Sequence, residues 1–290
     1  MQQPNVRGFF DHATATWSYV VWLEGHEDRR CAIIDSVLDY DPFACRTTTT
    51  SADCLIRFVK EKNLVVQWIL ETHIHADHLT AAPYIQAQLG GKTAISRHIL
   101  AVLNTWEGYF HNEADTPLDG SQFDHLFEDD EKFSIGPLEA QIIHTPGHTP
   151  ADTTYIIGDA VFVGDVILLP DVGTGRCDFP DGSSEDSYTS SRKLFALPEQ
   201  YRMYVGHDYP PANQRTAQCM TTIKEQKEQN VRCHEGIDKE TYMRQRDADD
   251  TGKTLPPLLL PSIQVNLRNG TFGQETAGVQ YIKLPVNIFS

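Results

Sequence analysis

The residues with the greatest chemical potential in this chain lie at positions 71–80, which read Glu-Thr-His-Ile-His-Ala-Asp-His-Leu-Thr. His73, His75 and His78, with Asp77 among them, bring three imidazoles and a carboxylate together within six residues. Side chains two positions apart in extended backbone point to the same side, so His73 and His75 can face one centre. The bend that follows turns Asp77 and His78 toward that centre. Imidazole and carboxylate are transition-metal ligands, and this density predicts a metal site rather than a loop of solvated histidines.

The segments on either side of this cluster indicate how it is positioned. Residues 64–70, Leu-Val-Val-Gln-Trp-Ile-Leu, form a short apolar run rich in β-branched residues, which is typical of a buried strand. A helix is expected to begin near Thr80. The cluster would then lie in the turn between a buried strand and a helix, and could face a metal from two directions.

Three further residues with ligand side chains follow predicted strands. His148 lies in Thr-Pro-Gly-His-Thr-Pro, where proline and glycine favour a tight turn with the imidazole at its tip. Asp165 ends the run Phe-Val-Gly-Asp, and His207 lies in Val-Gly-His-Asp-Tyr. Each of them alone would more often be structural. Together with the cluster, they predict one metal centre assembled at the ends of several strands.

Length and composition limit the possible functions. The chain has 290 residues and a formal net charge of -16, which argues against a nucleic-acid or anionic-membrane surface because both need a basic footprint. An anionic small substrate would need a locally positive pocket. No apolar run reaches membrane-spanning length, and the six cysteines show neither a Cys-x-x-Cys pair nor a dense framework. We expect a cytoplasmic protein, or a mitochondrial matrix protein if a transit peptide has been removed.

The remaining pattern predicts an α/β protein in which strands lead to chemical residues. Besides the buried strand, strands are expected at residues 16–23 and 31–35, which form an opening hairpin, and at 93–96, 138–143, 153–157, 160–163 and 263–267. Ser51 is a candidate N-cap, and further helices are expected at 81–89 and 213–229. Loops are expected at 36–50 and 104–130, and an extended linker at 255–261. We expect a catalytic domain at 1–210, with 211–290 as a C-terminal helix and extension packing on the same domain.

The order His-x-His-x-Asp-His, then His148, Asp165 and His207, resembles the motif order of the metallo-β-lactamase superfamily. The resemblance implies an αββα sandwich of two mixed β-sheets flanked by helices. In the dinuclear hydrolases of this superfamily, the positions matching His73, His75 and His148 hold one metal ion. Those matching Asp77, His78 and His207 hold the second, and the one matching Asp165 bridges them.

A finer resemblance, from about residue 9 to beyond residue 234, is to the persulfide dioxygenases, also called sulfur dioxygenases, and especially to their bacterial members. Its most discriminating segment is Gly-Arg-Cys-Asp-Phe at 175–179, because glyoxalase II usually has lysine in place of Arg176. The tail from Glu235 onward resembles a C-terminal extension found in bacterial relatives. The resemblance implies one ferrous ion held by His73, His148 and Asp165, a ligand set that leaves open positions on the metal, as in other non-haem oxygenases. It implies oxidation of glutathione persulfide by O2 and water to sulfite and glutathione, in hydrogen sulfide detoxification.

The other four ligand-type residues, His75, Asp77, His78 and His207, are then hypothesised to orient the imidazoles and metal-bound water, with a second metal as the alternative. The alternative enzyme is a dinuclear hydrolase of glyoxalase II (hydroxyacylglutathione hydrolase) type, with zinc or mixed metals. A non-catalytic persulfide sensor is a third possibility, although the complete ligand set argues against it.

Substrate recognition can be predicted from the charges of glutathione, which has two carboxylates and one ammonium group. Arg176 and Tyr209, next to ligand-bearing segments, are candidate substrate-binding residues, and Asp178 is expected to orient Arg176 or a ligand. Arg232 is a further candidate because it resembles a substrate-binding arginine of the glutathione-using branches. Cys177 is expected to be a buried thiol without a role in the reaction. The family resemblance also implies a homodimer.

Overall fold

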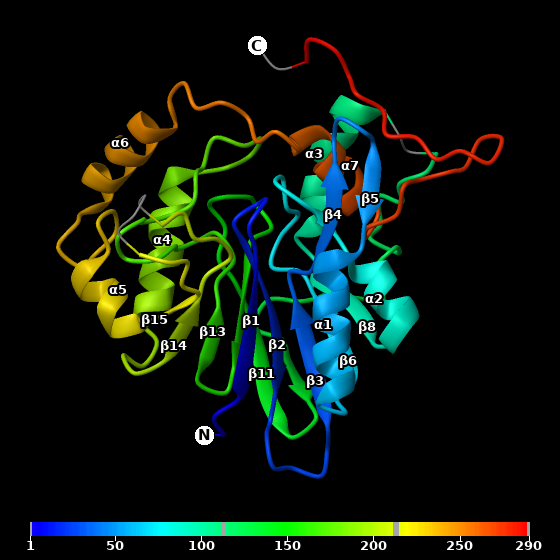
Figure 1. Ribbon diagram of the computed structural model, residues 1–290. Coiled ribbons are helices and arrows are strands. Elements are labelled where there is room, and N and C mark those ends of the chain that lie inside the picture. Colours follow the sequence, from blue (N-terminus) through cyan, green and yellow to red (C-terminus); the bar gives the residue numbers. More distant parts are fainter. Residues whose placement is uncertain (1, 112–113, 211–214, 289–290) are drawn as a thin grey trace.

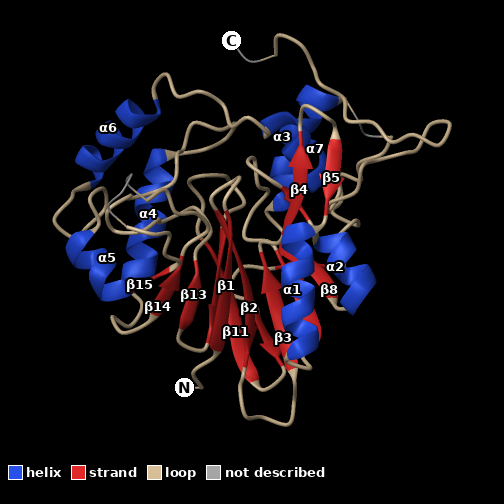
Figure 2. Ribbon diagram, in the orientation of Figure 1, coloured by secondary structure: helices blue, strands red, loops and turns tan. Residues whose placement is uncertain are grey.

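Two six-stranded β-sheets lie between two groups of helices in the computed structural model, which describes residues 2–111, 114–210 and 215–288 (Figure 1). Helices α4, α5 and α6 cover one side, and α1, α2, α3 and α7 lie on the other (Figure 2). This layer order agrees with the expected αββα sandwich. No helix in the described part of the chain is long and apolar enough to cross a membrane.

The first sheet contains the strand that leads to the histidine cluster. Its strands, in spatial order, are β1 (Asn5–Asp11), β2 (Thr16–Trp22), β3 (Arg30–Ile34), β6 (Val65–Leu70), β8 (Lys92–Ser96) and β9 (His125–Phe127). Strand β2 is antiparallel to its neighbours β1 and β3, whereas β3, β6, β8 and β9 run parallel. The sheet is therefore mixed, and the central parallel strands place their carboxyl ends at one edge.

The second sheet carries the other predicted ligands. Its strands, in spatial order, are β10 (Lys132–Ile135), β11 (Leu138–His144), β12 (Thr153–Ile157), β13 (Ala160–Phe162), β14 (Arg202–Tyr204) and β15 (Met220–Thr222). Only the pair β13 and β14 is parallel. A small third sheet joins β5 (Arg46–Thr48), β4 (Val37–Asp41) and β7 (Leu79–Thr80) beside the centre.

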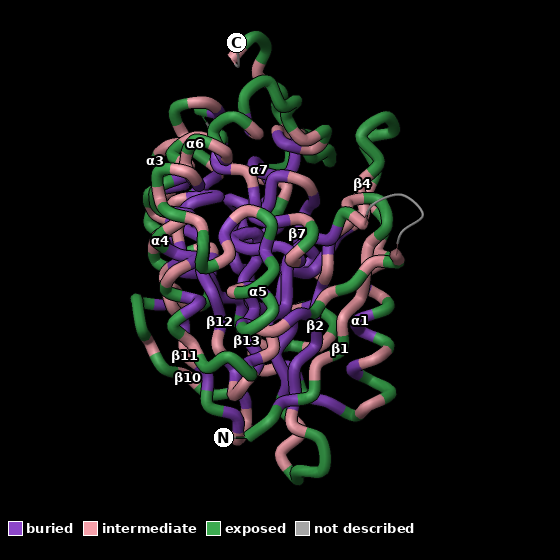
Figure 3. Tube along the Cα trace, turned by 90° about the vertical axis from the view of Figure 1, so that its left-hand side faces the viewer, coloured by how far each residue is buried: buried purple, intermediate pink, exposed green. Residues whose placement is uncertain are grey.

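Alternation along the strands explains why both faces of the first sheet are buried. On β2, Tyr19 and Val21 face the second sheet and pack with residues such as Tyr155, whereas Val20 and Trp22 face the helices. The helices are α1 (Thr50–Glu61), α2 (Ala82–Leu89), α3 (Ile99–Phe110), α4 (Ser184–Phe195), α5 (Ile223–Gln229), α6 (Lys239–Asp250) and α7 (Leu259–Asn266). Figure 3 shows buried backbone through the middle of the molecule and exposed chain toward the C-terminus.

Several predicted elements are confirmed within two residues, among them the opening hairpin (β2 and β3), the buried strand (β6) and the strands β11, β12 and β13. The segment 36–50 is not a loop, because it contains β4 and β5. Helix α1 begins at Thr50, and the Ser51 hydroxyl donates to Asp39 Oδ1 (2.7 Å) instead of capping the helix. The helix expected near Thr80 begins at Ala82, since Thr80 belongs to β7.

Other differences arise from burial. The segment 104–130 includes the end of α3, whose buried Val102, Leu103, Trp106 and Phe110 recur at helical spacing. The expected strand at 263–267 is mostly helix α7, in which polar and apolar residues alternate as they would in a strand and both kinds are buried. Of the helix expected at 213–229, only residues 223–229 are helical, because Thr222 caps α5 and Met220–Thr222 form β15; residues 213–214 lie outside the described part. The domain division at residue 210 stays a prediction.

Candidate metal centre

The predicted ligands come together at one edge of the two sheets, where β6, β11, β13 and β14 end. Asp35, directly after β3, fixes the first turn: its carboxylate accepts from the Thr72 amide (2.8 Å) and the Thr72 hydroxyl (2.9 Å). A carboxylate that binds both groups of one residue holds that backbone in a single orientation. Asp35 therefore positions His73, the next residue along the chain.

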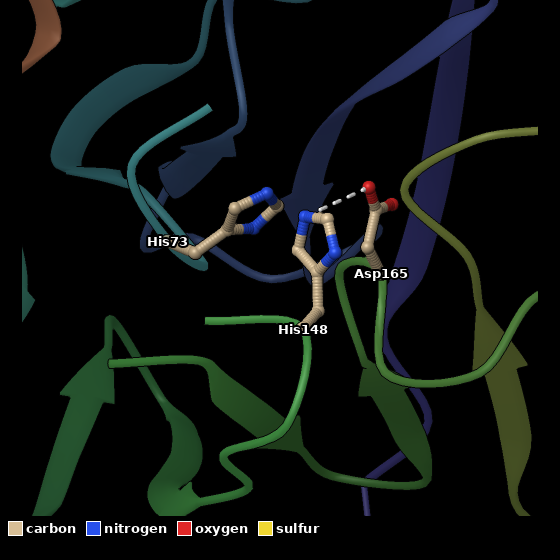
Figure 4. A group of neighbouring side chains, drawn as sticks. All are labelled: His73, His148 and Asp165. Atoms are coloured by element: carbon tan, nitrogen blue, oxygen red, sulfur yellow. Dashed lines mark ion pairs between the residues drawn. The ribbon is translucent and has the colours of Figure 1, made fainter. Parts of the chain in front are cut away.

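The first ligand group consists of His73, His148 and Asp165, whose side chains approach one another from three separate loops (Figure 4). One ligand atom of each lies within 4.8 Å of the others, and the His148 Nε2 to Asp165 Oδ2 distance is 3.6 Å. All three side chains are buried. The group therefore has the composition and compactness of a metal site with two histidines and one carboxylate.

The hydrogen-bond partners assign which nitrogen of each imidazole in this group carries the lone pair. His148 Nδ1 lies 2.7 Å from the Arg176 carbonyl, which can only accept, so Nδ1 is protonated and Nε2 has the lone pair. The Thr72 hydroxyl donates to Asp35 and therefore accepts from His73 Nδ1 (3.0 Å). His73 Nε2 is then left buried without a partner among the described residues. Burial and the neighbouring His75 lower the pKa of His73 well below its ordinary value, which keeps it neutral as a metal ligand must be.

A second ligand group, His75, Asp77 and His78, adjoins the first. His75 Nε2 lies 3.1 Å from Asp35 Oδ1 and 3.2 Å from Glu71 Oε2, so its Nδ1 is the atom left without a partner. His78 Nδ1 bonds Asp77 Oδ2 (3.0 Å) and leaves Nε2 unpartnered. Burial lowers the pKa of His75, but Asp35 and Glu71 outweigh this and raise it well above its ordinary value. Both carboxylates contact Nε2, so they hold a proton on that nitrogen and leave Nδ1, once deprotonated, as the atom that a metal would bind.

Unpartnered buried nitrogens test whether these residues fit a metal. Leaving a buried polar atom without a partner is costly, and such atoms are rare in folded proteins. His73 Nε2, His75 Nδ1 and His78 Nε2 are three such atoms in one place. Nitrogen lone pairs beside two carboxylates are a suitable donor set for a divalent transition metal, so the residues fit the group that the sequence pattern predicts.

His207 differs from the other four histidines because both of its ring nitrogens are occupied. Nδ1 lies 2.6 Å from Asp165 Oδ1, and Nε2 lies 2.8 Å from Asp77 Oδ2. Burial alone would lower the pKa of His207, but the two carboxylates raise it well above its ordinary value. His207 therefore acts as a cationic bridge between a carboxylate of the first group and a carboxylate of the second.

Thr16 is a member of the centre that the sequence did not reveal. Its hydroxyl, fully buried at the start of β2, lies 3.0 Å from Asp77 Oδ2 and 3.0 Å from His207 Nε2. Asp35 and Glu71, which bind His75, were also missed. A threonine at the start of a strand, such as Thr16, has no distinctive sequence signal. Asp35 did have one, because it directly follows a predicted strand, as the predicted ligands do.

The centre opens into a cavity of about 490 Å³, a size that accommodates a small peptide or cofactor. Asp77, His148, Asp165 and His207 line its inner end, with the half-exposed Tyr209 stacked parallel to His207. The wall contains four basic side chains, Arg176, Arg232, Arg246 and Lys253. Each of these cations is paired with a carboxylate: Arg176 with Asp178, Arg232 with Asp249, and Arg246 and Lys253 with Asp250. An anionic substrate would therefore compete with these carboxylates for the cations.

The predicted substrate-binding residues lie around this cavity in two ion pairs. Arg176 forms a bidentate pair with Asp178 (2.5 and 2.6 Å), so Asp178 lies against Arg176. Arg232 pairs with Asp249 of α6 (2.7 Å), a residue that the sequence did not single out. Cys177 is buried, and burial raises the pKa of its thiol to about 12, which makes it unreactive at neutral pH.

The chain belongs to the metallo-beta-lactamase superfamily, whose sequence model matches residues 13–207. It is 48% identical to glyoxylase B2 of Dictyostelium discoideum over 264 residues, which cover 90% of each chain. It is 44% identical to a probable metallo-hydrolase of Burkholderia pseudomallei, covering 97% of this chain and 99% of that protein.

Similarity to persulfide dioxygenases is lower but extends over most of the chain. The bovine mitochondrial persulfide dioxygenase ETHE1 is 31% identical over 208 residues, which cover 70% of this chain and 68% of that protein. The crystal structure of ETHE1 from Myxococcus xanthus superposes with a TM-score of 0.72 at 26% identity, covering 92% of this chain and 100% of that one.

Proposed function

We propose that this protein is a glutathione-dependent persulfide dioxygenase, which oxidises glutathione persulfide with O2 and water to sulfite and glutathione. The proposed cofactor is one ferrous ion held by His73, His148 and Asp165, and the proposed role is hydrogen sulfide detoxification. The observation that most supports a single metal ion is that His207 bonds Asp165 and Asp77 through its two ring nitrogens, so it offers no lone pair to a second metal. Of the first ligand group, His148 and Asp165 line the cavity and His73 lies buried beside them, which gives two histidines and one carboxylate, as in non-haem ferrous oxygenases.

The cavity supports a glutathione substrate. Arg176, Arg232 and Lys253 are paired with Asp178, Asp249 and Asp250, and can exchange these partners for the two carboxylates of glutathione. Asp249 can then accept from the ammonium group of glutathione. Tyr209, beside His207, can donate its hydroxyl to the substrate near the metal. The similarity to the bovine and Myxococcus ETHE1 proteins supports the same substrate class.

The side chains of the centre have separate tasks in this reaction. When bound, ferrous iron supplies the one-electron chemistry that allows dioxygen to react with a persulfide, which spin rules otherwise make slow. The cations of the cavity wall bind and orient the peptide so that its terminal sulfur points to the inner end. His207 and Thr16 hold Asp77 and Asp165 in place, and the tautomers of His73 and His148 are fixed by Thr72 and the Arg176 carbonyl.

A second candidate is a dinuclear hydrolase of glyoxalase II type, in which zinc or mixed metals would activate water for hydrolysis of a glutathione thioester. The observation that favours it is the second ligand group, because His75 Nδ1 and His78 Nε2 are unpartnered beside Asp77. The name of the Dictyostelium relative, glyoxylase B2, is consistent with this class.

An oxygen-electrode assay separates the two candidates. Anaerobically purified protein, given glutathione persulfide, should consume oxygen and release sulfite, and should leave a hydroxyacyl-glutathione thioester intact. His148→Ala should abolish oxygen uptake, whereas His26→Ala, in an exposed turn far from the centre, should behave like the wild type. Thioester cleavage without oxygen uptake would refute the dioxygenase. The cytoplasmic location and the homodimer stay predictions, and sedimentation of the purified protein would test the latter.

A further inference from the structure

Helix α6 is unusual because its buried face is polar. Its buried residues are Tyr242, Arg246 and Asp250, spaced four apart and therefore on one side of the helix. Arg246 and Asp250 form a bidentate ion pair (2.9 and 2.5 Å), and only 4% and 6% of their surfaces are exposed. In Figure 1 this helix lies beside α4 on the outer side of the second sheet.

A buried ion pair needs an explanation other than stability. Removing two charges from water costs free energy that their attraction does not reliably repay, and apolar residues of similar size often stabilise a protein more. The pair is therefore expected to hold something in place. Its remaining hydrogen bonds identify what that is.

The three residues of this helix face bind the backbone and one side chain of residues 174–177. The Arg246 Nη1 group donates to the Thr174 carbonyl (3.1 Å), and the Tyr242 hydroxyl donates to Thr174 Oγ1 (3.0 Å). Asp250 Oδ2 accepts from the Cys177 amide (2.8 Å). The helix thus fixes both ends of a four-residue segment.

The same segment touches two candidate metal ligands. The Arg176 carbonyl accepts from His148 Nδ1 (2.7 Å), which determines the tautomer of that imidazole. The Gly175 amide donates to the Asp165 carbonyl (3.0 Å), and a Cβ on Gly175 would lie only 2.1 Å from that oxygen. Any shift of residues 174–177 would therefore be passed on to His148 and Asp165.

We propose that Arg246 and Asp250 are positioning residues of the metal centre, which hold residues 174–177 so that the Arg176 carbonyl orients His148. The C-terminal extension then sets how tightly the centre retains its metal. The inference rests on the metal site of the proposed function and is independent of whether a persulfide or a thioester is the substrate. Hydrogen-bond partners one step behind a metal ligand commonly change metal affinity by about 10–100-fold when lost.

The test measures how fast a chelator removes the metal from the loaded protein. Three variants are compared with the wild type: Arg246→Lys, Asp250→Asn, and the double variant Arg246→Met with Asp250→Leu. The double variant replaces the pair by apolar side chains, so the fold should be retained while the bonds to residues 174–177 are lost. Arg244→Met, an exposed arginine of the same helix, is the matched control. Thermal unfolding of the metal-free proteins reports the stability of each fold separately.

We expect metal release to be about 10–100-fold faster in the double variant, with a smaller effect in the single ones, and unchanged in the control. Release at the wild-type rate from a folded double variant, or from both single variants, would overturn the positioning role and leave α6 as packing alone. A wild-type protein that binds no metal would instead refute the proposed function, so the two failures are distinguishable.

Discussion

Replacing Thr16 by valine removes one hydroxyl from the metal centre with almost no change in side-chain volume. That hydroxyl is fully buried and lies 3.0 Å from Asp77 Oδ2, 3.0 Å from His207 Nε2 and 2.7 Å from the Thr14 hydroxyl. The variant therefore tests whether the bridge between Asp77 and His207 depends on a residue outside the ligand motifs.

The expected loss can be worked out from these contacts. A hydrogen bond to a charged group contributes about 1.5–3 kcal/mol, and Asp77 keeps its bonds to His78 and His207, so we expect the free energy of unfolding to fall by about 2 kcal/mol. For a chain of 290 residues that lowers Tm by roughly 3 °C. Because Asp77 and His207 lose a fixed partner, we also expect turnover to fall by about 10–100-fold.

Thermal unfolding and oxygen uptake, measured on the same preparations, check both numbers. Thr221→Val is the matched control, because Thr221 on β15 is buried and donates to Glu225 Oε2 of α5 (2.8 Å), away from the centre. It should lose stability to a similar degree and keep its activity. Turnover of Thr16→Val within twofold of the wild type would refute the role given to this hydroxyl.

Three further predictions concern the cavity, the pH response and the segment beside Asp165. Tyr209→Phe should raise KM for the persulfide by roughly 3–10-fold without changing Tm, because the half-exposed phenol loses only a bond to substrate; an unchanged KM would exclude that bond. Burial raises the pKa of Asp152 from 3.8 to about 6, so this group stabilises the fold below pH 3.8 and the effect is lost as pH rises through 6. On acidification from pH 6 to 3.8, the free energy of unfolding of the metal-free wild type should rise by ~3 kcal/mol relative to that of Asp152→Asn. Denaturant titrations that give a constant difference in stability between the two proteins over this pH range would contradict this. Gly175→Ala should fold but hold much less metal, since the new Cβ meets the Asp165 carbonyl oxygen, whereas Gly108→Ala, with open space around it, should bind metal normally.

The sequence predicts most of the sheet framework because its strands are short, apolar and followed by turn residues. The buried strand β6 and the hairpin of β2 and β3 are clear examples. The sequence of helix α7 predicts a strand because polar and apolar residues alternate there, and only tertiary packing, which buries both kinds, makes the segment helical. Strand β1, with its exposed and half-buried residues, carried no comparable apolar signal.

The candidate ligands could be predicted because histidines and carboxylates seldom occur so close together in sequence except at metal sites. The structure brings all seven of them into adjoining groups. Thr16 could not be, since its part in the centre depends on a contact with Asp77 across 61 positions of sequence. The same holds for Arg246 and Asp250, which look like surface charges in a polar helix until the fold places them against residues 174–177. Hydrogen-bond partners that lie one step behind a ligand are set by tertiary packing, not by local pattern.

The most direct test of the central claim is a titration of the metal-free protein with ferrous iron under anaerobic conditions, followed by measurement of persulfide-dependent oxygen uptake at each step. The account predicts that activity rises linearly and saturates at one iron per chain, with sulfite as the product. Saturation at two metal ions per chain, with thioester cleavage that needs no oxygen, would contradict it and make His75, Asp77, His78 and His207 metal ligands of a hydrolase.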